Sequence, residues 1–507
     1  METLFIIIIS LCITTIIKSI ISHPRLNNNN KLPPGPSLLH STFLFLTNSP
    51  LNFKPILINL KSKYGPIFTL RFGFKTNIFI SDHSLAHQVL VQKGALFSDR
   101  PKSVITRTIS TSPYGPSWRT LRRNLASEIL HPTRVKAYSW ARKWVLQVLI
   151  NRMQRGREVD GTVEVVEHFK YAMFCLLVFM CFGEKVDESK INKIVKIQRR
   201  LLLNFASGRF SVLTVFPVLG KIIFRKRWKE FEKSRSDRDE VIVPLIKSRR
   251  SGNEGIVTYA DTLVNLRMPE EETDNGNGGR LNYMEMASLC SELLNAGTDT
   301  TAAALQWIMA NLVKHPQIQR KLYDEIVAVV GPSPAPVEQE VDLEYVVTEE
   351  NLGKMPYLKA VVLEGLRRHP STHLLLPHRV MKEVEVQGYM IPEGATINFM
   401  VSEMGLDPKV WDEPMEFKPE RFLVNDGDCV FDITGSKGIK MMPFGAGRRI
   451  CPGYDLGLLH LEYFVANLVW YFDWSIIDGC DIDMSEKTEF TVVMKDPLRA
   501  RVSTRTP

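Results

Sequence analysis

The segment that most constrains this chain is FGAGRRICPG, residues 444–453. Its fixed positions form the pattern FxxGxRxCxG, made by Phe444, Gly447, Arg449, Cys451 and Gly453. A chain of this length would match that pattern by chance roughly once in ten thousand. The lone cysteine could be a redox thiol, half of a disulfide, a metal ligand or a residue without a role.

The chemistry of this loop favours a ligand role for Cys451. Its glycines allow a close approach to a flat group, and Arg449 adds positive charge that stabilises a thiolate. The helix expected after Pro452 and Gly453 brings the positive end of its dipole to the sulfur. A thiolate that a loop holds against a flat group indicates an axial ligand of haem.

The remaining cysteines and the charge balance exclude other classes. The chain has seven cysteines, and their spacing matches neither a CxxC zinc site nor a disulfide framework, so a thiol-keeping compartment fits best. The net charge of +9, from 64 basic and 55 acidic residues, is spread along the chain. Because no Lys/Arg block with interleaved aromatic residues occurs, nucleic acid is not expected as a partner.

The first residues predict a membrane anchor. Residues 3–22 are almost wholly apolar, and twenty helical residues span about 30 Å. Positive side chains follow this segment at Arg25 and Lys31, which places the N-terminus in the lumen and the rest in the cytosol. A cleaved signal peptide is the alternative, but the segment has no basic start and no clear cleavage site. Residues 23–37 form a polar and proline-rich hinge.

Residues 38–507 are predicted to form one mainly helical domain with a small mixed β-sheet region. Helical patterns are expected at residues 119–130, 137–153, 163–181, 190–204, 227–249, 284–314, 317–329, 356–368 and 455–472. Strands are expected at residues 66–73, 76–81, 383–391 and 396–401. The acidic and glycine-rich residues 269–280 are expected to form an exposed loop.

The middle of the helix expected at residues 284–314 contains residues that do not favour helix formation. Ala296, Gly297, Asp299 and Thr300 belong to the run AGTDTT, in which the glycine alone costs about 1 kcal/mol against alanine. The glycine would let another group lie against the backbone, and an acid beside an alcohol can relay protons. A kink with a satisfied aspartate remains the alternative.

Three further sets of residues have weak signals when each is taken alone. Glu364 and Arg367 can pair across one helical turn, and Arg421 lies downstream in a turn-like stretch. Trp118 and Arg122 share one helix face, where both could donate hydrogen bonds to a carboxylate. The alternatives are surface charges and ordinary packing.

Taken together and in this order, the motifs resemble those of the cytochrome P-450 superfamily, the haem-thiolate monooxygenases, from PPGP near residue 33 to the strand-rich segment FTVVMKDPLRARV near the end. The resemblance covers essentially the whole chain. Within that superfamily the chain resembles the plant microsomal A-type enzymes of secondary metabolism, and in particular plant family eighty-nine, subfamily A. It implies the P-450 fold, mainly α with a small mixed sheet, behind an N-terminal transmembrane helix.

The resemblance also implies a role for each motif. Cys451 would bind the iron of haem b, and Phe444 would shield its sulfur. The haem propionates would be bound by Trp118, Arg122, Arg449 and His378. Asp299 and Thr300 would deliver protons during oxygen activation, beside Ala296 and Gly297. Glu364, Arg367 and Arg421 would form a buried charge triad.

The resemblance further implies partners and a location. No dinucleotide-binding fingerprint occurs in the chain, so electrons from NADPH would arrive through a separate cytochrome P-450 reductase, with cytochrome b-five as a further candidate donor. The expected site is the endoplasmic reticulum membrane, with one span and a cytosolic catalytic domain in contact with lipid. Four basic residues near the proximal motifs are expected to meet the acidic face of the reductase: Arg119, Arg123, Lys440 and Arg448.

The expected substrate is a hydrophobic or amphipathic small molecule that gains one oxygen atom from O2. The pocket walls are expected to be mostly apolar and to come from residues 103–109, 205–213, 294–298, 372–375 and 490–493. Two other functions stay open. One is a haem-thiolate isomerase or dehydratase that works without reductase, and the other is a non-catalytic haem-binding protein.

Overall fold

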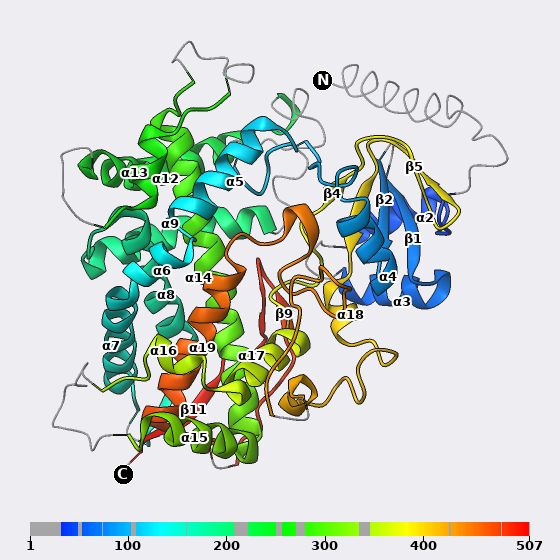
Figure 1. The fold of residues 1–507 in the computed structure, drawn as a ribbon. Coiled ribbons are helices and arrows are strands. Elements are labelled where there is room, and N and C mark those ends of the chain that lie inside the picture. Colours follow the sequence, from blue (N-terminus) through cyan, green and yellow to red (C-terminus); the bar gives the residue numbers. More distant parts are fainter. Residues whose placement is uncertain are drawn as a thin grey trace.

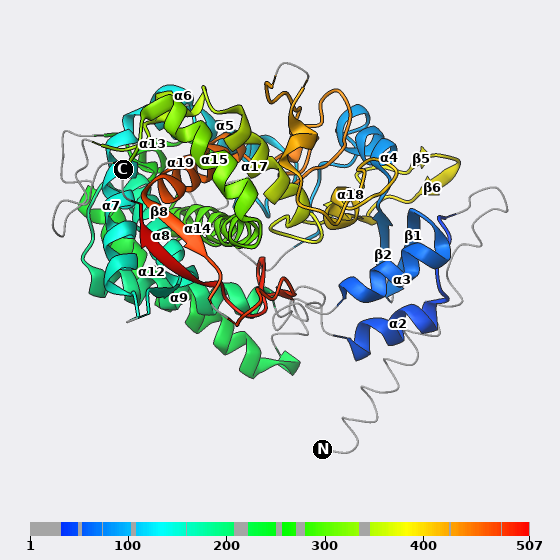
Figure 2. The ribbon, with the colours of Figure 1, turned by 90° about the horizontal axis from the view of Figure 1, so that it is seen from below.

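The computed structural model describes residues 32–48, 53–72, 75–102, 108–158, 160–206, 222–249, 256–269, 279–333, 345–424, 427–477 and 479–505. Helices fill one side of the molecule, and a sheet with short helices lies at the other side (Figure 1). The view from below shows the same division, with β1 and β2 far from the helices around α14 (Figure 2).

All nine long helices expected from the sequence form, with ends that differ by a few residues. They are α5 Pro116–Glu128, α7 Ser139–Arg155, α8 Val166–Phe182, α9 Glu188–Ala206, α12 Arg225–Arg249, α14 Tyr283–Lys314, α15 Pro316–Val330, α17 Pro356–Arg368 and α19 Tyr454–Tyr471. Shorter helices were not expected: α2 Leu38–Thr47, α3 Lys54–Tyr64, α4 His83–His87, η2 Gln88–Gln92, α6 Pro132–Ala137, α13 Tyr259–Asn265, α16 Glu349–Leu352, α18 Val401–Gly405, η4 Pro419–Phe422 and η5 Gly447–Arg449.

The long helix α14 organises the helical part of the molecule. It begins at a capping box, in which Asn282 accepts from the backbone N–H of Glu285 and the Glu285 carboxylate accepts from that of Asn282. It packs against α8, α12, α17 and α19. Because α8 is apolar on nearly every face, it is buried between its neighbours.

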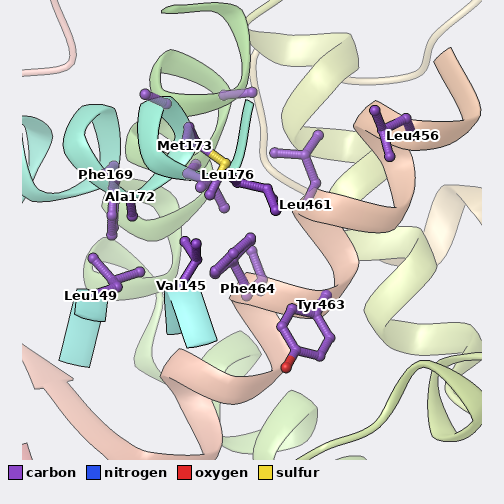
Figure 3. Packing of buried hydrophobic residues seen from close by; sticks show 14 of the residues in the cluster. Val145, Leu149, Phe169, Ala172, Met173, Leu176, Leu456, Leu461, Tyr463 and Phe464 are labelled. Atoms are coloured by element: carbon purple, nitrogen blue, oxygen red, sulfur yellow. The ribbon is translucent and has the colours of Figure 1, made fainter. Parts of the chain in front are cut away.

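The main hydrophobic core lies where α7, α8 and α19 meet. Figure 3 shows Val145 of α7 beside Phe464 of α19, with Leu149 of α7 and Phe169 of α8 in the same cluster. All four side chains are fully buried. This packing fixes the position of α19, whose first residue follows the cysteine loop directly.

Within the described residues, four small sheets complete the fold. The largest is mixed and has the order β1 Ile67–Phe72, β2 Lys75–Ile80, β7 Thr396–Phe399, β4 His378–Arg379, with β2 and β7 parallel. The others are β3 Thr162–Glu164 with β11 Arg499–Thr504 and β8 Phe472–Ser475, the pair β9 Glu486–Thr488 and β10 Val492–Met494, and the pair β5 Val384–Val386 and β6 Tyr389–Ile391.

The single strand expected at residues 383–391 is wrong. The chain turns back at Gln387 and Gly388, which both have positive φ, 48° and 77°, and the two halves pair as β5 and β6. Such a turn has the twist that hairpin strands need. The predicted strands at 66–73, 76–81 and 396–401 correspond to β1, β2 and β7.

The expected anchor at residues 3–22 lies outside the described residues, as do most of the hinge at 23–37 and of the loop at 269–280. Among the helices that the structure describes, none is long and apolar enough to cross a membrane.

Candidate functional site

The cysteine loop is held in a tight turn before α19. Gly447 has φ +70°, and a Cβ atom there would lie 2.0 Å from the carbonyl oxygen of Leu90, so only glycine fits at this position. The backbone N–H of Cys451 donates to the carbonyl of Phe444 at 2.8 Å. Cys451 and Phe444 both line the large cavity of the molecule.

The electrostatic support of Cys451 differs from the one expected. Burial raises the pKa of the thiol, while the N–H of Gly453 and the positive charge of Arg122 oppose that rise. Gly453 is the residue that precedes α19, so the helix N-terminus does face the sulfur. Arg449 was expected to be the stabilising cation, but its guanidinium is bound to carbonyl groups elsewhere, and Arg122 takes this part.

Arg449 connects the cysteine loop to a distant segment of the chain. Its Nε donates to the carbonyl of Ser98 at 2.7 Å, and its Nη2 donates to that of Ser112 at 2.8 Å. Its guanidinium carbon also lies 4.3 Å from the centre of the Trp118 ring, a cation–π distance. Arg449 thus fixes the loop against the residues that begin α5.

Three arginines gather at this side of the cavity. Burial lowers the pKa of Arg449 to about 9, with Arg100 and Arg122 lowering it further. Burial also lowers the pKa of Arg100 to about 10, opposed by Asp99 and Glu292, and lowers that of Arg122. Closely spaced cations in a buried place favour an anionic partner.

Sequence reasoning missed Arg100. Its only signal was its place between Asp99 and Pro101, which does not distinguish it from a surface arginine. In the structure it is 8% exposed and lines the cavity. Its Nη1 donates to the carbonyls of Leu376 and Pro377 at 2.8 Å.

Trp118 and Arg122 do line the cavity together, on one face of α5. The Trp118 side chain is buried, and its Nε1 has no acceptor among the described residues. A buried N–H without an acceptor is rare in folded proteins, which indicates that a ligand supplies the acceptor.

His378 also lines the cavity, but with a restricted role. Its Nδ1 lies 2.7 Å from the carbonyl of Phe97, and burial lowers the pKa of the ring to about 3. A carbonyl only accepts, so Nδ1 carries the proton, and the neutral ring presents Nε2 as an acceptor. His378 could therefore donate to a carboxylate only after that carboxylate had raised its pKa.

The residues present fit a haem. The arginines at positions 100, 122 and 449 and the unpaired Trp118 N–H suit a group with two carboxylates, and Cys451 offers the thiol that an axial ligand requires. Arg100 belongs to this cluster although it was not among the residues expected from the sequence.

The opposite wall of the cavity is the middle of α14. Ala296, Gly297 and Thr300 line it, and the Thr300 hydroxyl donates to the Ala296 carbonyl at 2.5 Å. A Cβ atom at Gly297 would lie 2.6 Å from a methyl group of Leu177, so this glycine admits the neighbouring helix α8 as well as facing the cavity. No kink from proline occurs here.

Asp299 stands on α14 beside this wall but is not among the residues that line the cavity. Burial raises the pKa of its carboxyl group, and the positive charges of Lys170 and Arg199 oppose that rise. Both cations belong to a partly exposed ion-pair network with Glu167 and Glu489. Asp299 therefore lies within electrostatic range of a partly exposed ion-pair network and is the chain neighbour of Thr300.

The charge triad forms as a buried unit. Glu364 and Arg367 are both completely buried and share two hydrogen bonds of 2.7 and 2.8 Å. Arg421 donates through Nε to the same carboxylate at 3.1 Å. Arg367 also donates to the carbonyls of Gly405 and Pro414, so the triad ties α17 to the segment before the cysteine loop.

The cavity has a volume of about 800 Å³ and is lined mostly by apolar side chains. Of the expected wall residues, those that line it are Thr108, Ile109, Phe205, residues 295–297, the whole segment 372–375 and residues 490–492. Leu294, Thr298 and Val493 do not, because alternate faces of a helix or strand point away from the cavity. Residues 103–107 and 207–213 lie outside the described residues.

Comparisons with known proteins agree with this geometry. The family described as Cytochrome P450 matches residues 33–502. Cytochrome P450 89A9 from Arabidopsis thaliana is 46% identical over 99% of this chain and 98% of its own length, and cytochrome P450 71B24 from the same plant is 29% identical over 93% and 95%.

Among solved structures, a zebra fish cytochrome P450 determined with abiraterone has a TM-score of 0.70 and covers 89% of this chain and 100% of its own. At 23% identity that likeness concerns the fold alone.

Proposed function

This chain belongs to the cytochrome P450 family of haem-thiolate monooxygenases, and we propose that it oxidises a hydrophobic or amphipathic small molecule with electrons from a separate NADPH-dependent reductase. The identity with a plant enzyme over nearly the whole chain confirms the resemblance to plant subfamily eighty-nine A. The observation that supports the proposal most is a single cavity bounded by Cys451 on one side and Thr300 on the other.

Haem bound through a thiolate supplies the activation of dioxygen that lets one oxygen atom enter a C–H bond. The chain's own residues bind, orient and supply protons. Trp118 and the arginines at positions 100, 122 and 449 hold the propionates, and Phe444 covers the sulfur side. The apolar walls exclude water from the substrate.

We assign proton delivery to Asp299 and Thr300. Since burial raises the pKa of Asp299, its carboxyl group holds a proton to higher pH than an exposed one. The ion-pair network behind it reaches solvent and can return that proton. The Thr300 hydroxyl donates to the Ala296 carbonyl, and Thr300 lines the cavity. This pair favours a monooxygenase over an isomerase or a carrier, which need no proton delivery.

The test is reconstitution of the full chain with NADPH–cytochrome P450 reductase, NADPH and a broad panel of apolar compounds. We expect product only when both NADPH and O2 are present. We expect Thr300→Ala to lower product formation about tenfold or more while NADPH consumption continues, because loss of one positioned proton donor costs about 10²–10⁴-fold in the step it serves. Product without NADPH would favour the isomerase, and NADPH consumption without any product would favour the carrier.

We propose that residues 3–22 anchor the chain in the endoplasmic reticulum membrane, with residues 38–507 as the cytosolic catalytic domain. The reductase shares that membrane, and cytochrome b-five is a second candidate donor. Alkaline extraction of microsomes should leave the full chain in the membrane pellet and should release a variant that lacks residues 1–22.

We also propose that the reductase docks on the side of the cysteine loop. Arg119, Arg123, Lys440 and Arg448 are all exposed there. Arg119 and Arg448 both contact Tyr114, the latter through a hydrogen bond of 2.6 Å to its hydroxyl, so the two cations are adjacent.

Reversal of charge at Arg119 and Arg448 to glutamate should raise the reductase concentration needed for half-maximal turnover about tenfold at low salt, and should flatten its salt dependence. Turnover supported by a peroxide in place of reductase should not change. Lys233→Glu, on an exposed part of α12, is the control. Unchanged reductase dependence in the double variant would contradict this docking site.

A further inference from the structure

A polar group of residues lies in the cavity at a distance from the cysteine loop, where α9, α12 and α14 meet. Arg235 of α12 lines the cavity there. Its Nε is buried and has no hydrogen-bond partner in the described part of the chain. Its guanidinium lies 5.7 Å from the centre of the Phe231 ring, and no carboxylate of the described residues forms an ion pair with it.

The neighbouring charged groups are already paired. Arg238, which also lines the cavity, donates twice to Asp239, at 2.6 and 2.9 Å. Asp237 is paired with Arg200 of α9. The carboxylate of Glu292 accepts from the backbone N–H groups of residues 109 and 110, each at 2.8 Å, so its charge is balanced there. Arg235 is therefore left with a charge that no described neighbour compensates.

Helices α9 and α14 bring uncharged hydrogen-bond donors close to Arg235. Arg200 of α9 pairs with Asp237 of α12, two residues after Arg235, and Gln198 of α9, two residues before Arg200, accepts from Asn295 of α14. The three helices, which all contact one another, therefore meet close to Arg235, Gln198 and Asn295. Asn295 lines the cavity, as does Ser291 one turn earlier.

These side chains share one acceptor and leave one donor free. The amide oxygen of Gln198 accepts from the Ser291 hydroxyl at 2.6 Å and from the Asn295 amide at 3.1 Å. Gln198 is 2% exposed, and its Nε2 has no acceptor among the described residues. Two buried N–H donors without acceptors, one of them cationic, favour an anion at this place.

We propose that Arg235, with Gln198 and Asn295 beside it, binds a carboxylate of an amphipathic substrate whose apolar part extends toward Thr300. Along the axis of α14, Asn295 and Thr300 are separated by about 7.5 Å. The wall around Arg235 is apolar, with Leu201, Leu202 and Leu293. This inference rests on the proposed function and narrows its substrate class to organic acids.

The test uses the full holoenzyme and two probes that share one chain, dodecanoate and its methyl ester. Dissociation constants are measured from the change in Soret absorbance and, independently, by calorimetry. Wild type should bind dodecanoate about tenfold more tightly than the ester, the difference that one charge-assisted pair commonly gives. Arg235→Gln should abolish that preference by weakening dodecanoate alone, and Arg235→Lys should retain part of it.

Lys233→Gln removes the same charge from an exposed position on the same helix and should leave both constants unchanged. No preference for the acid in wild type, or equal weakening of acid and ester in Arg235→Gln, would overturn the proposal. Every variant is first checked for the reduced carbon monoxide spectrum. If wild type did not show the red-shifted carbon monoxide band, the haem-thiolate function itself would be refuted. A normal band without a preference for the acid would refute only the acid site.

Discussion

Replacement of Cys451 by alanine is expected to abolish the strongly red-shifted Soret band of the reduced carbon monoxide complex, together with all reductase-supported turnover. In the proposed site the sulfur of Cys451 binds the haem iron, and its electron density sets both properties. Within the described part of the chain, the side chains that bound the cavity near this loop include no second cysteine. The measurement is a carbon monoxide difference spectrum of wild type and variant at equal protein concentration.

Cys480→Ala is the matched control, because Cys480 is an exposed free cysteine away from the cavity. It should retain the wild-type spectrum. A red-shifted band that survives in Cys451→Ala would contradict the assignment of the ligand and the function built on it. Haem content should be measured together with the spectrum, because a variant without haem and a variant whose haem has a different ligand would both lack the red-shifted band.

The second large effect is expected at Glu364. Removal of its carboxylate by Glu364→Ala would leave Arg367 completely buried without a counter-charge, with Arg421 beside it. Breaking a buried pair in this way costs about 3–5 kcal/mol. The variant should unfold at a clearly lower temperature and should lose haem on mild heating, both followed by the Soret absorbance.

Glu350→Ala provides the comparison, since Glu350 forms an exposed pair with Lys136, in which both side chains are more than three-quarters exposed. Such a pair contributes about 0–1 kcal/mol to the free energy of unfolding, so its loss should hardly change the unfolding temperature. If Glu364→Ala were as stable as Glu350→Ala, the triad would not have the structural role that we assign to it.

The sequence was sufficient to predict the long helices and the motifs that meet at the cavity, because both depend on local pattern. Hydrophobic periodicity defines α9 and α15, and the glycines of the cysteine loop are identified directly from the sequence. The turn at Gln387 and Gly388 was missed, since a short strand and a hairpin share the same alternation of apolar residues until the turn is recognised.

What the sequence could not supply was the partner of each charged group. Arg449 bonds to carbonyls more than 330 residues earlier in the chain, and nothing local indicates that choice. For the same reason Arg100 looked like a surface residue, and Arg122 was not recognised as the cation beside the thiol. Glu364 and Arg367 could be paired by spacing, but their complete burial depends on Gly405 and Pro414, 38 and 47 residues after Arg367.

The mixed sheet has a consequence for the time course of synthesis. Strand β2 pairs in parallel with β7, so Asn77 meets Thr396, about 320 residues later in the chain. At about 5–20 residues per second, the ribosome delivers β7 roughly 15–60 s after β2. During that interval the β1–β2 hairpin presents an unpaired edge that contains Ile78, Phe79 and Ile80, a template for unwanted strand addition. Chaperone demand should therefore be greatest midway through translation, and mutations that weaken β7 should appear first as aggregation of the nascent chain.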